Sequence, residues 1–268
     1  MLLKIEHRTH YIYSEPVSYT IQQLRLTPPE GYGQHVRNWE IRVNGNLYRA
    51  VDTFGNIAHT LVVDALHEEL TIIAYGEVET GVETHSVYEP MPLQIYLRST
   101  PLTTLDDNLK SFADQFKSNT GVVGLKEIEA LMKAIVERVP YEKGSTDVDT
   151  SAAMAFALGK GVCQDHVHIF VTCCRALGVP ARYVSGYLFT EDGSQLMSHP
   201  WADVWLPVKG WHSLDVCNGG NTGEGHVRLA SGLDYRDACP ISGSRVGGGE
   251  EKMTVNVKVN QMQQQQAQ

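Results

Sequence analysis

The chain has 268 residues, 42% of them apolar and 20% charged, which is typical of a globular protein with enough apolar material for a core. Its formal net charge is −9 and it has no cluster of Lys and Arg, which argues against nucleic acid and anionic membrane surfaces as partners. The N-terminal sixteen residues, MLLKIEHRTHYIYSEP, contain no continuous apolar stretch, so we expect no signal peptide, no membrane span and a cytoplasmic location.

Strand patterns dominate residues 1–90. The run WEIRV (39–43) alternates apolar and charged residues, and Asn44-Gly45 and a further apolar run follow it, which predicts a β-hairpin. The run LTIIAYGEVET (70–80) is also rich in β-formers. No helical period of useful length occurs here, so we expect an all-β, sandwich-like N-terminal domain over residues 1–90.

A proline-rich stretch, assigned to 91–104, predicts a linker to a region of helices. Thr104 is the candidate cap of the first helix, and a short helix is predicted near 151–158. The inner face of the first helix is predicted to be formed by Leu109, Phe112, Ala113 and Phe116. A second helix follows it, with an inner face formed by Ile128, Leu131, Met132, Ile135 and Val136.

The next helix is predicted to start at or near Cys163, with an inner stripe of Val167, Phe170, Val171, Cys174 and Leu177. Four β runs follow it, at 181–189, 201–207, 210–216 and 253–259. We assign 105–260 to this second domain and expect the Gln-rich tail 261–268 to be disordered. The fold class is therefore α+β.

The five cysteines are an odd number and include an adjacent pair, which makes a disulfide framework awkward and favours free thiols in a reducing compartment. No CxxC pair is present, and His166 and His168 are two residues apart on a predicted helix, so they point to different faces. We expect no metal and no cofactor.

Cys163 lies in GKGVCQDHVHIF, after two glycines and at a predicted helix start. A helix N-terminus stabilises a thiolate, the nucleophilic form of cysteine, and offers backbone N–H groups to an oxyanion. His199 stands at the start of one β run and Asp215 at the end of the next. Because a hairpin brings those two ends together, we expect His199 and Asp215 to be neighbours, as a base and the group that orients it.

The segments GVCQDHVHIFVTCCRALGVPARYVSGY and SHPWADVWLPVKGWHSLDVCNG resemble the core of the transglutaminase-like superfamily, which has a papain-like fold. The segments HRTHYIYSEPV, LRLTPP and HVRLASGLDYRDACPISG resemble its bacterial members, so the resemblance covers nearly the whole chain. It implies Cys163 as nucleophile, His199 as base and Asp215 as the third member of a triad. The chain departs from the common pattern at four positions: Pro200, Val216, Cys217 and Leu233.

The resemblance implies acyl transfer on peptide or protein amide bonds, without a cofactor. Water as the second nucleophile would make the protein a peptidase or amidase, which we favour, and an amine would make it a protein-glutamine transglutaminase. A non-catalytic peptide-binding module on the same fold is a further alternative. The oligomeric state stays open. We also expect the N-terminal domain to dock on the core and shape one side of the substrate groove.

Other notable side chains have simpler interpretations. Asp165, in the first turn of its helix, is expected to cap it or complement its dipole. The side chains expected to be structural are Cys173, Cys174, Cys217, Cys239, His166 and His168. The candidates for the edge of the substrate site are His212, His226, Trp201 and Trp211.

Overall fold

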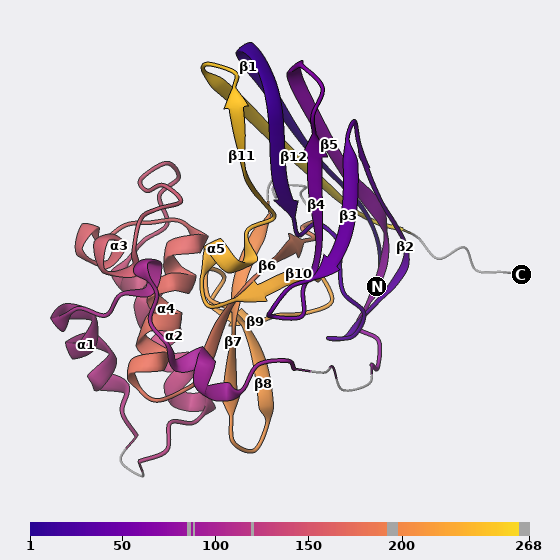
Figure 1. Ribbon diagram of the computed structural model, residues 1–268. Helices are drawn as coiled ribbons and strands as arrows, with labels where there is room; N and C mark the ends of the chain where they lie inside the picture. Colours follow the sequence, from indigo (N-terminus) through magenta and orange to yellow (C-terminus); the bar gives the residue numbers. More distant parts are fainter. Residues whose placement is uncertain (85–86, 88, 119–120, 192–197, 263–268) are drawn as a thin grey trace, which may run out of the picture.

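A computed structural model describes residues 1–84, 87, 89–118, 121–191 and 198–262. In this part of the chain a seven-stranded sheet lies beside a five-stranded sheet that is covered by helices (Figure 1). The larger sheet consists of β1 (Leu2–Leu24), β2 (Gln34–Val43), β3 (Asn46–Val51), β4 (Ile57–Val63), β5 (His67–Thr80), β11 (Ile241–Gly247) and β12 (Glu251–Gln261). The predicted tail lies outside the described residues from 263 onward.

The long strand β1 holds the larger sheet together. Its first half pairs with β5 and β12, and its second half pairs with β4 and β11, with an irregular register between Ile12 and Val17. The two halves enclose one apolar cluster, so the domain is sandwich-like, as predicted. The cluster contains Tyr11, Tyr13, Val17, Leu24, Leu26, Leu61, Val63, Leu70, Ile72 and Ala74.

The predicted hairpin at Asn44-Gly45 is wrong. Strand β2 pairs with β5, whereas β3 pairs with β4, so the turn carries the chain from one half of the sheet to the other. Ile41 on β2 and Leu47 on β3 pack on the same apolar cluster. Each strand buries its apolar side chains in this core by pairing with a strand other than its sequence neighbour, so β2 and β3 do not form a hairpin.

The smaller sheet is antiparallel, in the order β10-β6-β7-β8-β9. Its strands are β6 (Ala181–Leu188), β7 (His199–Leu206), β8 (Gly210–Asp215), β9 (Gly220–Asn221) and β10 (His226–Gly232). The helices are α1 (Asp107–Ala113), α2 (Leu125–Arg138), α3 (Ala152–Leu158), α4 (Cys163–Ala176) and α5 (Tyr235–Ala238). Helix α4 packs on β6 and β7 and contacts α1, α2 and α3, so it is the centre of this domain.

Helix α4 starts at Cys163, as predicted. Asp165 caps it by accepting a 2.7 Å hydrogen bond from the Val162 N–H. A Cβ atom at position 161 would lie 2.8 Å from the Asp165 side chain, so the glycine of the sequence leaves room for this cap. His166 and His168 are core residues, also as predicted, because both are fully buried and bonded to the backbone at Val139 and Tyr235.

Two local predictions need correction. The cap of α1 is Asp106, whose side chain accepts from the Leu109 N–H at 2.8 Å, whereas the Thr104 hydroxyl donates to the backbone of the preceding turn. The predicted linker contains two short 3₁₀ turns, Leu93–Leu97 and Pro101–Thr103. Arg175 of α4 donates to the Tyr96 carbonyl and to the Thr103 hydroxyl, so this segment is part of the packed domain.

The boundary predicted at residue 260 does not follow the sheets. Strands β11 and β12 lie in the predicted second domain but pair with β1, so the chain returns to the N-terminal sheet (Figure 1). An apolar cluster then joins the two sheets, with Leu3, Ile5, Val78 and Val257 on one side and Tyr187, Val227 and Leu229 on the other. The fold therefore depends on contacts between the sheets as well as within them.

Buried charges pair beneath this junction. Asp203 of β7 is fully buried and accepts from Arg182 at 2.8 Å and from Arg228 at 2.7 Å. Arg182 also donates to Glu89 at 2.6 Å. Burial alone would raise the pKa of Asp203, but the Arg228 and Arg182 charges outweigh it and hold that pKa below its ordinary value.

We expect Asp203→Asn to lower the free energy of unfolding by about 3–5 kcal/mol, because the change leaves buried arginine charges without their partner. Urea unfolding followed by circular dichroism measures the loss. Asp149→Asn is the matched control, since Asp149 pairs with Arg236 at the surface with 73% of its side chain exposed. That control should cost less than about 1 kcal/mol. Equal losses in the two variants would contradict this account of the charge cluster.

Candidate active site

His199 and Asp215 are hydrogen-bonded neighbours, as the hairpin argument predicts. His199 opens β7 and Asp215 closes β8, and the antiparallel pairing of the two strands brings these ends together. His199 Nε2 lies 2.9 Å from Asp215 Oδ2, and both side chains are at least 97% buried. With Nε2 bonded to the carboxylate, Nδ1 is the nitrogen left for another partner.

Cys163 forms a disulfide with Cys217. The expectation that Cys163 and Cys217 are free thiols, with Cys217 structural, is therefore wrong. Their Cα atoms are 5.1 Å apart, within the range that a disulfide requires. Cys217 follows Asp215 by two residues, so the Cα atoms of Cys163 and Asp215 are at most about 12 Å apart. The fold thus brings the start of α4 close to the end of β8.

The other three cysteines are free and buried, as expected. Burial, with a smaller contribution from Asp106, raises the pKa of Cys173 to about 12. Burial also raises the pKa of Cys174 and of Cys239. Such thiols stay protonated at neutral pH and are poor nucleophiles. Cys163, at a helix N-terminus close to the end of β8, is the stronger candidate for chemistry.

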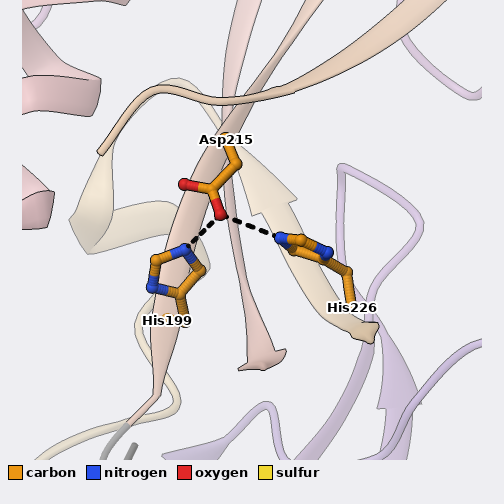
Figure 2. A group of neighbouring side chains, drawn as sticks. All are labelled: His199, Asp215 and His226. Carbon is orange, nitrogen blue, oxygen red and sulfur yellow. Dashed lines mark hydrogen bonds and ion pairs between the residues drawn. The ribbon is translucent and has the colours of Figure 1, made fainter. Parts of the chain in front are cut away.

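His226 of β10 completes the cluster, although its sequence context predicts only a place at the edge of the substrate site. Its Nε2 lies 2.9 Å from the same Asp215 Oδ2 that binds His199 (Figure 2). Asn218 adds a further hydrogen bond to this oxygen at 2.8 Å. Burial alone would raise the pKa of Asp215, but the hydrogen bonds from His199 and His226 outweigh it and hold that pKa well below its ordinary value.

This cluster also has donor atoms suited to a metal, since the ligand atoms of His199, Asp215 and His226 all lie within 4.8 Å of one another. The hydrogen bonds of His226 argue against that use. The Gly223 N–H donates to His226 Nδ1 at 3.0 Å, so in the neutral ring Nε2 carries the hydrogen. A metal at Nε2 would require a hydrogen on Nδ1, facing the Gly223 N–H. The arrangement favours a hydrogen-bonded cluster.

A pocket of about 280 Å³ lies at the junction of the two domains beside the cluster. Tyr32, Gln34 and Thr80 line it from the N-terminal domain, and Trp201, His226 and Arg228 line it from the second domain. The N-terminal domain thus docks on the core as expected and forms part of this pocket. Trp211 instead packs on Tyr96 and Trp205, and the His212 ring is bonded to Asn221.

None of the helices in the described ranges is both long and apolar enough to cross a membrane. The chain matches the model of the bacterial transglutaminase-like N-terminal region over residues 3–79. It matches the model of the transglutaminase-like superfamily over residues 110–216, a range that includes Cys163, His199 and Asp215.

Two sequence relatives match this chain over very different lengths. An uncharacterised protein of Mycobacterium leprae is 26% identical over 279 residues, covering 97% of this chain and 99% of that protein. A protein-glutamine gamma-glutamyltransferase of Pseudomonas aeruginosa is 29% identical over 102 residues, which is 32% of this chain and 15% of that enzyme.

A crystal structure of a proposed cysteine protease from Cytophaga hutchinsonii has the same fold. It superposes with a TM-score of 0.79 at 21% identity and covers 100% of this chain and 92% of that one. The N-terminal β domain, the helix-covered antiparallel sheet and the two family matches agree with one another. The chain therefore belongs to the transglutaminase-like superfamily and has the N-terminal region of its bacterial members.

Proposed function

We propose that the protein is a cysteine-dependent acyl-transfer enzyme that acts on peptide or protein amide bonds. The observation that supports this most is the buried His199–Asp215 hydrogen bond close to the N-terminus of α4, where Cys163 lies. A nucleophile, a base and a group that orients the base are the parts that covalent acyl transfer requires.

In this mechanism His199 takes the Cys163 proton, and the sulfur attacks the carbonyl carbon of an amide. The N–H groups at the start of α4 stabilise the oxyanion of the tetrahedral intermediate. The intermediate collapses when the C–N bond breaks and the His199 imidazolium gives its proton to the leaving amine. A second nucleophile then attacks the thioester and loses its proton to His199, and the Cys163 thiol is regenerated. Asp215 keeps the imidazole in the required tautomer.

The active form must be the reduced one, because a sulfur in a disulfide cannot attack a carbonyl. A cytoplasmic location, which we propose from the sequence, would keep Cys163 and Cys217 reduced. We propose hydrolysis as the main reaction, in line with the description of the Cytophaga hutchinsonii protein as a proposed cysteine protease. Transamidation is the second candidate, supported by the gamma-glutamyltransferase relative. The buried His199–Asp215 pair argues against a module that only binds peptides.

To test the proposal, the reduced protein is incubated with a mixed peptide library and a biotinylated primary amine, and the products are identified by mass spectrometry. Cleaved or deamidated peptides are expected with the wild type and none with Cys163→Ala. Biotin on glutamine side chains would instead identify a transglutaminase. The absence of any product that depends on Cys163 would leave the peptide-binding module as the better description.

A further inference from the structure

One oxygen of Asp215 accepts hydrogen bonds from histidines on two different strands. His199 Nε2 and His226 Nε2 each lie 2.9 Å from Oδ2, and the two ring centroids are 5.9 Å apart (Figure 2). A cysteine–histidine–aspartate triad needs one histidine. The second therefore requires an explanation of its own.

The surroundings of His226 make it a fixed donor. The Gly223 N–H donates to Nδ1 at 3.0 Å, so the only lone pair of the neutral ring is occupied and Nε2–H is directed at Asp215. A proton on Nδ1 would face the Gly223 N–H, so protonation of His226 would break that bond. In this tautomer His226 donates to Asp215, and neither ring nitrogen has a free lone pair.

His226 also covers Asp215. Its side chain is 12% exposed and lines the 280 Å³ pocket, whereas the Asp215 side chain is 3% exposed. Removing the imidazole would open the carboxylate to water from the pocket. Water around Asp215 would compete for Oδ2 and weaken its bond to His199.

The N-terminal domain is hydrogen-bonded to the backbone on both sides of His226, at Glu224 before β10 and at Arg228 within it. The Gln34 side chain accepts from the Arg228 N–H at 2.8 Å and donates to the Arg228 carbonyl at 3.1 Å. On the other side, the Thr80 hydroxyl donates to the Glu224 carbonyl at 2.5 Å. Gln34 and Thr80 are both at least 97% buried. Two residues of one domain thus fix the backbone two positions before and two positions after His226.

We propose that His226 is a positioning residue for Asp215, and that the N-terminal β domain holds His226 in place through Gln34 and Thr80. The inference rests on the proposed function for its effect on turnover, because kcat depends on His226 only if Asp215 orients His199 for catalysis. It gives the N-terminal domain a part in the reaction that does not depend on its contact with substrate.

The first test compares His226→Phe with His226→Gln in the reduced, full-length enzyme, after circular dichroism has shown that both fold. Phenylalanine keeps most of the volume but has no donor, so kcat is expected to fall about tenfold with KM unchanged. Glutamine can place an N–H near the position of Nε2 and should recover most of the loss.

The second readout is the pH dependence of Cys163 alkylation by iodoacetamide, which needs no peptide substrate. A loosely held Asp215 stabilises the His199 imidazolium less, so the thiolate of His226→Phe should form at higher pH than in the wild type. In His226→Gln the midpoint should stay near that of the wild type. A purely structural role for His226 would change the melting temperature and leave this midpoint unmoved.

Gln34→Ala and Asn56→Ala form a matched pair for the domain contact. Asn56 binds β10 at Ser231 through the same pair of backbone hydrogen bonds, both 2.8 Å, but five residues from His226. Gln34→Ala is expected to lower kcat about threefold or more and to raise the alkylation midpoint. Asn56→Ala should leave both unchanged, even where it lowers stability equally.

The inference is overturned if His226→Phe matches a catalytically active wild type in kcat and in its alkylation midpoint. Equal effects of Gln34→Ala and Asn56→Ala would overturn the part assigned to the N-terminal domain. Failure of the proposed function looks different: the wild type would then turn over no peptide. In that case a midpoint that still shifts in His226→Phe alone would uphold the positioning role, and a wild-type Cys163 that titrates as a free thiol would remove it.

Discussion

Protein prepared without a reductant is expected to show no measurable turnover, and an excess of dithiothreitol is expected to restore activity. The reason is the Cys163–Cys217 disulfide, which leaves the proposed nucleophile without a free thiolate. Loss of a catalytic nucleophile costs on the order of 10⁴-fold in turnover or more. Turnover measured before and after reduction, on protein whose disulfide has been confirmed by peptide mass spectrometry, gives the size of the effect.

Cys217→Ser separates this explanation from others, because the variant cannot form the pair. It should be active without reductant and gain little from its addition. Cys239→Ser is the matched control, since Cys239 is buried and free, and it should keep the full dependence on reductant. Equal activity of the wild-type protein with the disulfide intact and reduced would contradict the assignment of Cys163 as nucleophile.

The features that could be predicted from the sequence depend on short-range patterns. The start of α4 at Cys163 follows from a helical stripe preceded by glycines, and the structure reproduces it to the residue. The contact between His199 and Asp215 follows from two β runs joined by a short turn, which places the start of one strand beside the end of the next. Neither prediction needs knowledge of how distant segments pack.

The features that could not be predicted depend on long-range packing. Asn44-Gly45 is a good hairpin signal, but the partners of β2 and β3 are chosen by the apolar core that both strands share. The pairing of β12 with β1 joins segments more than 230 residues apart, and no local pattern marks it. His226 opens β10, which is not among the four predicted β runs, so the sequence does not place it beside Asp215.

The sequence does contain a signal for the disulfide. Cys217 is one of the four positions at which the chain departs from the pattern it resembles, and it lies two residues after Asp215. Once Asp215 is placed beside Cys163, a cysteine two positions further along the chain must also lie near Cys163. An odd number of cysteines argues only against a framework in which every cysteine is paired. It does not argue against a single disulfide between Cys163 and Cys217.

Asp215→Asn is expected to lower turnover by on the order of 10⁴-fold, with little change in KM, because the amide can no longer hold His199 in the required tautomer. The asparagine has the same shape, but it has one acceptor oxygen for two histidine donors that now share Oδ2. Alkylation of reduced Cys163 should also lose its reactivity at mildly acidic pH and follow a free thiol, with a midpoint near pH ~8.5.

The pH dependence of stability gives an independent check on the same substitution. Because the pKa of Asp215 is lowered in the folded protein, its ionised form stabilises the fold above the unfolded value of about 3.9. That stabilisation is lost as the pH falls toward the lower folded pKa. The free energy of unfolding of the wild type should therefore exceed that of Asp215→Asn. The difference should be largest at neutral pH and should shrink below about pH 4. Turnover of Asp215→Asn within threefold of the wild type would show that Asp215 is not the group that orients the base.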